Sequence, residues 1–488
     1  MVSILYQLLS FLLIFIILNS CSTNKNILAL KVPIKNNVNN EFDIRASGES
    51  RTIFMFIYTK EQEEAVNKLK LGDVTSALIN FEYLYNKNKN SNNLFNLAGA
   101  YYLNGNFQKA LSLYQEYSKF NENLTELYNN IGATYGNLGN YTEANNYYNK
   151  ALKINPNISV IYHNIGVEDK IKNSYQKALE SYNKALEINP NDPNSYYNRA
   201  NIFYLMKDYD SAIKDYSKAI DIGPNNPKFY NNRAIVQGEI TNIYDIAIKD
   251  YTIAIELKPN YTEAYFNRGI AYSNIARFKE AIKDFDKVLS LEPSFHSVYY
   301  YRGNAYFNLR QFEKAIENYD KLIELRPNFV KGYINRGSAY ALQNDFDKAI
   351  KDYTEAIKIE PNDKDIYYYR GNAYFNTGID KALELAIKDY TKLIELEKSE
   401  RAYFNRGSTY ASLKKYKQAI DDFTKAIELN SKSSENYYYR GLAYYFNNNV
   451  DLAQIDFRKS CEMGFKEACN SQLIDKFSKN DNSILISK

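Results

Sequence analysis

The sequence predicts an all-α protein built from repeated helix pairs, and three recurring features predict it. A small residue returns about every 34 residues, for example at Gly303, Gly337 and Gly371. An alanine follows each of them about twelve residues later, as Ala315 follows Gly303. Six units then close with a proline such as Pro327, which cannot supply the amide hydrogen that a helix interior needs. A fixed period over most of a 488-residue chain indicates a solenoid.

Each unit contains two predicted helices. Tyr299, Gly303 and Tyr306 have the spacing i, i+4, i+7, which places them on one face of a first helix. Ala315 and Tyr319 begin the same spacing on a second helix. Small residues fit where two helix backbones approach closely, and the aromatic side chains fill the space beside them.

This pattern resembles the tetratricopeptide repeat (TPR) family, whose 34-residue unit has conserved types at six positions. One unit shows them in order, at positions 4, 8, 11, 20, 24 and 32: Tyr333, Gly337, Tyr340, Ala349, Tyr353 and Pro361. The resemblance covers about residues 58–461 and implies a right-handed superhelical solenoid of about twelve units. One extra residue in 240–246 and three in 377–385 fall between the helices of a unit, and we expect loops to absorb them.

Eight consecutive units carry an arginine directly before the small residue, and seven of these also carry an aspartate just before the aromatic of the second helix. We single out four pairs: Arg199 with Asp215, Arg268 with Asp284, Arg336 with Asp352, and Arg406 with Asp422. The two residue types occur together, so we expect each arginine to bond its aspartate across the two helices. An anion-binding or catalytic ladder is the alternative, although paired charges leave little potential for a ligand.

In TPR superhelices the concave face is similar to a ligand groove. The repeat register identifies the residues of this sequence that would line it. Position 6 is mostly asparagine, and a column of amides can hold the backbone of an extended peptide whatever its sequence. At these positions alone the column resembles the asparagine ladder in the superhelix of O-linked N-acetylglucosamine transferase. These asparagines are Asn96, Asn130, Asn164, Asn198, Asn232, Asn267, Asn335 and Asn405. Position 5 adds aromatic side chains suited to recognition. The candidates are Tyr197, Phe266, Tyr300, Tyr368, Phe404 and Tyr438. The alternatives are surface asparagines and core aromatics.

Residues 1–20 resemble a bacterial lipoprotein signal. An apolar run from Val2 to Leu18 is followed by Ser20 and Cys21, which match the small residue and the acylated cysteine of such signals. The resemblance implies cleavage and a lipid on Cys21. No lysine or arginine precedes the run, however, so an uncleaved membrane helix is the alternative, and the positive-inside rule would then keep the repeats in the cytoplasm. We expect residues 21–57 to form an asparagine-rich tether.

The last unit ends with Cys461 and Cys469 on either side of Gly464. This spacing resembles the cross-helix disulfide of bacterial cysteine-rich, TPR-like repeat proteins, which implies an oxidising compartment. Two reduced cysteines packed under a capping helix are the alternative. We expect residues 462–488 to form that capping helix and a tail.

The composition and motifs favour a binding scaffold over an enzyme. The net charge of +4 supplies no strong field for nucleic acid, and three cysteines and two histidines are too scattered for a metal site. No nucleophile constellation or phosphate loop is present, so we expect no catalytic residues and no cofactor.

The leading hypothesis is therefore a membrane-anchored scaffold of the cell envelope, facing the periplasm or exterior, that binds an extended peptide. The alternatives are an envelope lipoprotein that binds glycan or peptidoglycan, and a membrane-tethered cytoplasmic assembly factor. The sequence identifies neither the ligand nor the oligomeric state.

Overall fold

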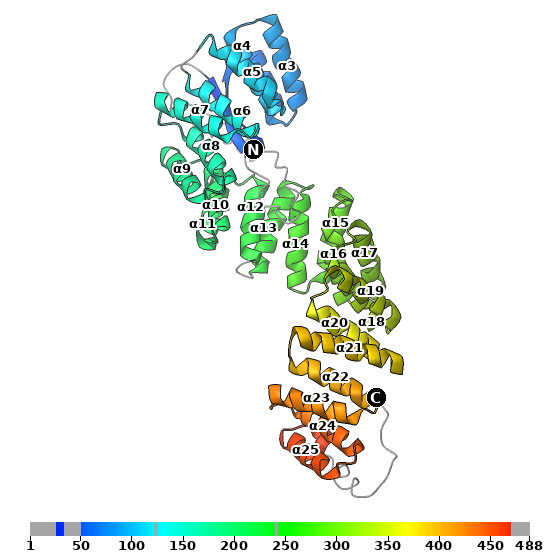
Figure 1. Cartoon of the computed structure of the whole chain (residues 1–488). Helices are drawn as coiled ribbons and strands as arrows, with labels where there is room; N and C mark the ends of the chain where they lie inside the picture. Colours follow the sequence, from blue (N-terminus) through cyan, green and yellow to red (C-terminus); the bar gives the residue numbers. More distant parts are fainter. Residues whose placement is uncertain (1–25, 34–49, 122–123, 240–242, 470–488) are drawn as a thin grey trace, which may run out of the picture. The chain divides into compact units, whose positions relative to one another are not determined.

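Twenty-four α-helices make up most of the computed structural model, which describes residues 26–33, 50–121, 124–239 and 243–469 (Figure 1). The chain divides into two compact units, one ending at Ala271 and the other beginning at Tyr272. Each unit has its own apolar clusters. The structure confirms the predicted all-α array of helix pairs.

The elements of the first unit begin with two strands and continue as helices, and the last of these, α14, runs three residues past Ala271. Their bounds are β1 (Asn26–Pro33), β2 (Ser50–Ile57), α2 (Lys60–Lys70), α3 (Val74–Lys87), α4 (Ser91–Leu103), α5 (Phe107–Ser118), α6 (Thr125–Asn137), α7 (Tyr141–Ile154), α8 (Ser159–Ile171), α9 (Tyr175–Ile188), α10 (Pro193–Leu205), α11 (Tyr209–Ile222), α12 (Pro227–Glu239), α13 (Tyr244–Leu257) and α14 (Thr262–Asn274).

The second unit continues the same alternation and ends with a short 3-10 helix. Its elements are α15 (Phe278–Leu291), α16 (Ser297–Asn308), α17 (Phe312–Leu325), α18 (Val330–Leu342), α19 (Phe346–Ile359), α20 (Lys364–Asn376), α21 (Asp380–Leu396), α22 (Glu400–Ser412), α23 (Tyr416–Leu429), α24 (Ser434–Phe446), α25 (Val450–Glu462) and η2 (Lys466–Cys469).

The small residue at position 8 lets an aromatic ring lie flat against the first helix. A Cβ atom added to Gly303 would lie 2.7 Å from Cε1 of Tyr319, the position-24 residue of its unit. The same ring contact occurs in seven units, with distances from the added Cβ of 2.7 to 3.1 Å. Real Cβ atoms rarely or never approach a ring so closely, so glycine permits the close helix pairing inside these seven repeats.

The three extra residues at 377–385 lengthen a helix, so the expectation that a loop absorbs them was wrong. Helix α21 has 17 residues, whereas the equivalent α19 has 14. The insertion contains Leu383, which is buried and adds apolar contact at the start of α21. Helical hydrogen bonds and this burial favour extending the helix over enlarging the turn.

The predicted tether over 21–57 contains two paired strands, which the sequence analysis did not anticipate. Strands β1 and β2 form a two-stranded antiparallel sheet, with Asn26 opposite Ile57 and Pro33 opposite Ser50. Strand β2 also packs against α4, α6 and α8. Among the described residues, the first unit is therefore a helical array with an extended segment of its own chain on it.

Several expectations concern residues outside the described part of the chain. These are the signal or anchor over 1–20, the acylation site Cys21, and most of the predicted cap and tail over 462–488. The described portion of the cap is η2, which follows α25.

Candidate functional site

Three position-6 asparagines hold the backbone of β2. Asn130 Oδ1 accepts from the Phe54 amide at 2.8 Å, and its Nδ2 donates to the Phe54 carbonyl at 2.8 Å. Asn164 makes the same two bonds to Thr52, both at 2.9 Å. Asn96 repeats the pattern on Phe56, accepting from its amide at 2.8 Å and donating to its carbonyl. Each amide replaces the two bonds that a neighbouring strand would supply.

The strand uses its two backbone edges differently. Residues 52, 54 and 56 turn their N–H and C=O groups to the asparagines, and the alternate residues face β1 across the antiparallel ladder. Asn129 adds a third bond to Thr52, donating to its carbonyl at 3.0 Å. The backbone of β2 is thus held from both sides although the strand is almost fully buried.

The amino end of β2 carries a buried ion pair. Arg51 donates from Nε and Nη2 to the two carboxylate oxygens of Glu168, at 2.5 and 3.1 Å, and from Nη1 to Asn137 at 3.0 Å. Both charged side chains have an exposed fraction of 0%. Burial alone would lower the pKa of Arg51, but the hydrogen bond and charge of Glu168 raise it above its usual value.

Glycines make room for the side chains of β2. A Cβ atom on Gly136 would lie 2.2 Å from Glu168 Oε1 and 2.5 Å from Arg51 Nε. The ion pair therefore packs directly against the backbone of Gly136, where no other residue would leave room. A Cβ on Gly99 would lie 3.2 Å from Met55 Cγ. On the opposite face of the strand, the ring centroids of Phe56 and Phe95 are 4.5 Å apart.

The other predicted asparagines bond to side chains of neighbouring first helices. In the first unit, Asn198 contacts His163 Nε2 at 3.3 Å, and Asn232 donates to Tyr197 at 2.9 Å and to Asn201 at 3.1 Å. Asn267 donates to Asn231 at 3.4 Å. Of the eight predicted asparagines, three bond the backbone of β2.

In the second unit, Asn335 donates to Asn304 at 2.8 Å and Asn405 donates to Asn372 at 3.2 Å. The acceptors Asn304 and Asn372, like Asn201, stand directly after the small residue, at position 9. The sequence analysis missed this second column. Its signal was visible, because asparagine recurs at position 9 in these units.

The predicted aromatics differ in how far they are buried. Tyr197 and Phe266 are 4% and 6% exposed, so they pack inside the array and offer no surface to a ligand. Tyr300, Tyr368, Phe404 and Tyr438 are half-buried. The core alternative therefore holds for the first two residues.

A cavity of about 760 Å³ opens between α20, α22 and α24 of the second unit. Its walls include Tyr368, Phe404 and Tyr439, and its polar groups include Asn372 and Asn405. Tyr390 donates to Asn372 Oδ1 at 2.6 Å, which fixes that amide. Arg401 covers the ring of Tyr368, with its guanidinium carbon 3.9 Å from the ring centroid.

Six of the arginines form the expected cross-helix pair with an aspartate. In six repeats the arginine Nε and Nη2 atoms donate to both carboxylate oxygens of the aspartate, at 2.6 to 2.9 Å. The pairs are Arg199 with Asp215, Arg233 with Asp250, Arg336 with Asp352, Arg370 with Asp389, Arg406 with Asp422, and Arg440 with Asp456. Arg302 reaches Asn318 at 2.8 Å. Arg268 donates to Thr252 at 3.0 Å, and Asp284 is buried in α15.

The same arginines have a second acceptor that the sequence analysis missed. The Nη1 atom of each bonds a polar residue on the second helix of the preceding unit. These acceptors are Asn183, Ser217, Thr252, Asp286, Asp320, Thr354, Thr391 and Thr424. Each arginine thereby joins adjacent units, and the signal was the unbroken run of polar residues at this position.

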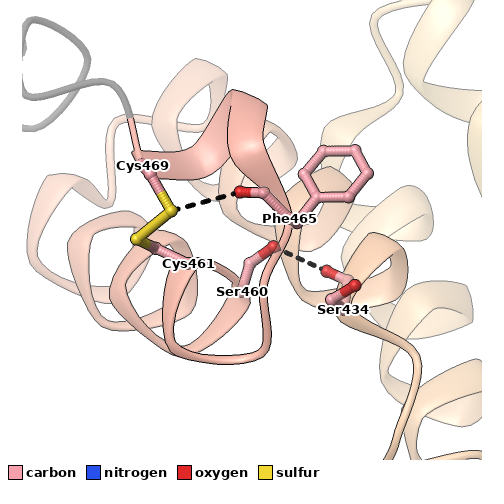
Figure 2. The surroundings of a disulfide bond; sticks show 5 residues. All are labelled: Ser434, Ser460, Cys461, Phe465 and Cys469. Carbon is pink, nitrogen blue, oxygen red and sulfur yellow. Dashed lines mark hydrogen bonds between the residues drawn. A yellow bond between two sulfur atoms is a disulfide. The ribbon is translucent and has the colours of Figure 1, made fainter.

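Cys461 and Cys469 form a disulfide that ties the end of α25 to η2 (Figure 2). Cys469 also contacts the carbonyl of Phe465 at 3.4 Å, and Ser460 donates to the carbonyl of Ser434 at 2.7 Å. The Phe465 ring lies 4.9 Å from that of Tyr438. The turn between α25 and η2 thus packs against α24 through this ring contact.

Two features are absent from the described residues. No described helix has the length and apolar character needed to cross a membrane. No cluster of three or more histidine, cysteine, aspartate or glutamate side chains able to hold a metal ion occurs among them.

Comparison with solved structures gives several partial matches to repeat proteins. YrrB, described as a TPR protein with an unusual peptide-binding site, is 27% identical, with a TM-score of 0.35, over 38% of this chain and 95% of its own. A tetratricopeptide repeat protein from Parabacteroides merdae is 20% identical, with a TM-score of 0.39, over 54% and 98%. Yeast Tom70 is 18% identical, with a TM-score of 0.33, over 80% and 96%. None of the curated proteins matches this sequence.

Family models match the chain in the observed register. The tetratricopeptide repeat model matches residues 125–158, 193–226, 262–295, 296–329 and 400–433, and a TPR repeat model matches 169–207 and 337–378. The five tetratricopeptide matches begin at or beside the first residue of α6, α10, α14, α16 and α22. Since the tetratricopeptide repeat model and the observed helix pairs share one frame at these residues, the matched segments are tetratricopeptide repeats.

Proposed function

We propose that this protein is an interaction scaffold that binds an extended peptide in the groove of the unit beginning at Tyr272. Tetratricopeptide repeat arrays commonly bind proteins or peptides and are generally not enzymes, which supports a scaffold. The observation that carries the finer proposal is the equivalence of Asn405 and Asn130. The two residues occupy position 6 of their units, and Asn130 already holds an extended backbone.

The surroundings of Asn405 support this role. Its Nδ2 atom donates to Asn372, while its Oδ1 atom accepts no bond from another described residue. In Asn130 that same atom accepts the strand amide. The cavity beside Asn405 is walled by Phe404 and Tyr439, whose rings supply contact area with few mobile dihedrals. An amide acceptor between aromatic walls suits a peptide in extended conformation.

Peptide selection on the full chain tests this proposal. Peptides selected from a random library would be measured by calorimetry against the wild-type protein, Asn405→Ala and the matched control Asn308→Ala, an exposed asparagine on α16. Loss of two hydrogen bonds predicts about thirtyfold weaker binding for Asn405→Ala, at roughly 1 kcal/mol a bond, and no change for the control.

Other outcomes contradict the proposal. Equal affinity of the peptide for wild-type protein and for Asn405→Ala would show that the peptide does not bind at Asn405. Binding of oligosaccharides instead of peptides, with the same loss in Asn405→Ala, would favour the glycan alternative, since aromatic faces and amides also suit sugars.

We also propose that the chain is anchored in the cell envelope through a lipid on Cys21. The support is the apolar run before Cys21 and the Cys461–Cys469 disulfide, because disulfides persist mainly outside the cytosol. Labelled fatty acid should enter the wild-type protein and a Cys461→Ser/Cys469→Ser control, but not Cys21→Ala. Label retained in Cys21→Ala would rule out acylation at that residue.

A further inference from the structure

We infer that the groove of α4, α6 and α8 is a second recognition site, specific for an extended segment with an arginine followed by apolar side chains two and four residues later. Arg51, Ile53 and Met55 are its built-in occupant. A partner's segment of the same pattern can replace them. The inference rests on the proposed function, since it assumes that these repeats bind extended peptides, and it adds a ligand class at a different site.

The asparagines read only the backbone. Asn96, Asn130 and Asn164 each bond one N–H and one C=O of β2, at alternate residues. Any extended segment except one with proline at these residues presents the same groups. The spacing of the three amides therefore fixes conformation and register, while the side chains between them decide which segment fits.

The strongest side-chain requirement is at Arg51. Its planar guanidinium donates to both oxygens of Glu168 and to Asn137, a fork that lysine cannot reproduce. Gly136 leaves the space that the pair fills. Without a guanidinium, Glu168 would be a buried charge with no counter-ion, so the site discriminates strongly against other residues.

The apolar requirements follow at alternate residues on the same face. Ile53 and Met55 both have an exposed fraction of 0%, and Met55 lies over Gly99. Both residues belong to the apolar cluster formed with α4 and α6. A polar side chain at either place would lose its hydration without a partner.

Strand β2 is attached to its site like a tethered ligand. It connects to α2 through Tyr58 and Thr59, whose amides donate to Gln62 Oε1 at 2.8 and 3.2 Å. The tether gives β2 a high effective concentration in the groove, so an external segment must outcompete it. A weakened β2 should therefore expose the site to the same sequence supplied from outside.

The test uses full-length protein and a fluorescent peptide with the sequence of residues 50–58. In Arg51→Glu, repulsion between the new glutamate and Glu168 weakens the built-in strand, and the peptide should bind at least about tenfold more tightly than to wild-type protein. Arg51→Glu/Glu168→Arg restores the pair with reversed charges, so affinity for the peptide should fall again. A peptide with its arginine changed to glutamate should not bind Arg51→Glu.

The inference is overturned if Arg51→Glu binds the peptide no more tightly than wild-type protein, or binds both peptides equally. If Arg51→Glu does not fold, amide hydrogen exchange is measured in wild-type protein instead. Excess peptide should then speed exchange at the amides of Thr52, Phe54 and Phe56, and unchanged exchange would overturn the inference. Asn405→Ala separates the two sites. If it abolishes binding of this peptide, the peptide lies in the second unit and only the proposed function survives.

Discussion

In the later repeats a single arginine joins three helices. This explains why arginine and aspartate occur together in these repeats. Arg336 bonds Asp352 on α19 through two atoms, at 2.8 and 2.6 Å, and Asp320 on α17 through a third, at 2.5 Å. Burial raises the pKa of Asp352 above its usual value even though Arg336 lowers it. The carboxylate is therefore costly to bury without its arginine, and the reverse holds for Arg336.

Replacing Asp352 with alanine should leave a largely buried guanidinium without its bidentate partner. We expect Asp352→Ala to lower the free energy of unfolding by roughly 3 kcal/mol, measured by urea denaturation. Asp347→Ala, at an exposed residue of the same helix, should change it by less than about 1 kcal/mol.

An asparagine at residue 352 should give an intermediate result. Arg302 already pairs with Asn318 at 2.8 Å, so Asp352→Asn can keep one bond. Equal unfolding free energies for Asp352→Ala and Asp347→Ala would show that the pair contributes no stability.

At the scale of the element, the helix pairs could be predicted because their determinants are local and repeated. Gly303 and Tyr319 lie 16 residues apart and pack inside one unit, so the sequence period alone reveals them. The length of α21 could not be read in this way. Its added residues fit a helix as well as a turn, and the burial of Leu383 decides between the two.

Strand β2 could not be predicted because its partners are distant and are side chains. Phe54 is bonded to Asn130, 76 residues away, and Arg51 to Glu168, 117 residues away. No repeat contains β2, so no period identifies it. The available signal was the apolar run from Ile53 to Ile57, which comes directly before the first helix pair. Such a run is unusual for a solvated tether. The asparagine positions could be predicted as backbone partners, but not that the chain supplies its own backbone.

At the scale of the whole molecule, the sequence's 48 tyrosines make stability sensitive to alkaline pH. Burial raises the pKa of Tyr197 and Tyr353 to about 12, and that of Tyr148 and Tyr182 well above the usual value near 10. A group whose pKa is raised by folding binds its proton more tightly in the native state. Its contribution to stability is complete below pH 10 and is lost as the pH rises through the folded-state pKa.

Each such tyrosine should therefore cost up to about 1.4 kcal/mol of unfolding free energy per pH unit above 10. Tyr182→Phe removes one of them with little loss at pH 8, because the Tyr182 hydroxyl has no hydrogen-bond partner among the described residues. Between pH 10 and 11, Tyr182→Phe should lose about 1 kcal/mol less than wild-type protein in urea denaturation, because an unfolded-state tyrosine is only half ionised at pH 10. Tyr83→Phe, at a residue 62% exposed, should lose as much as wild-type protein. If all three proteins lose stability equally, the alkaline transition comes from the lysines and not from the packed tyrosine rings.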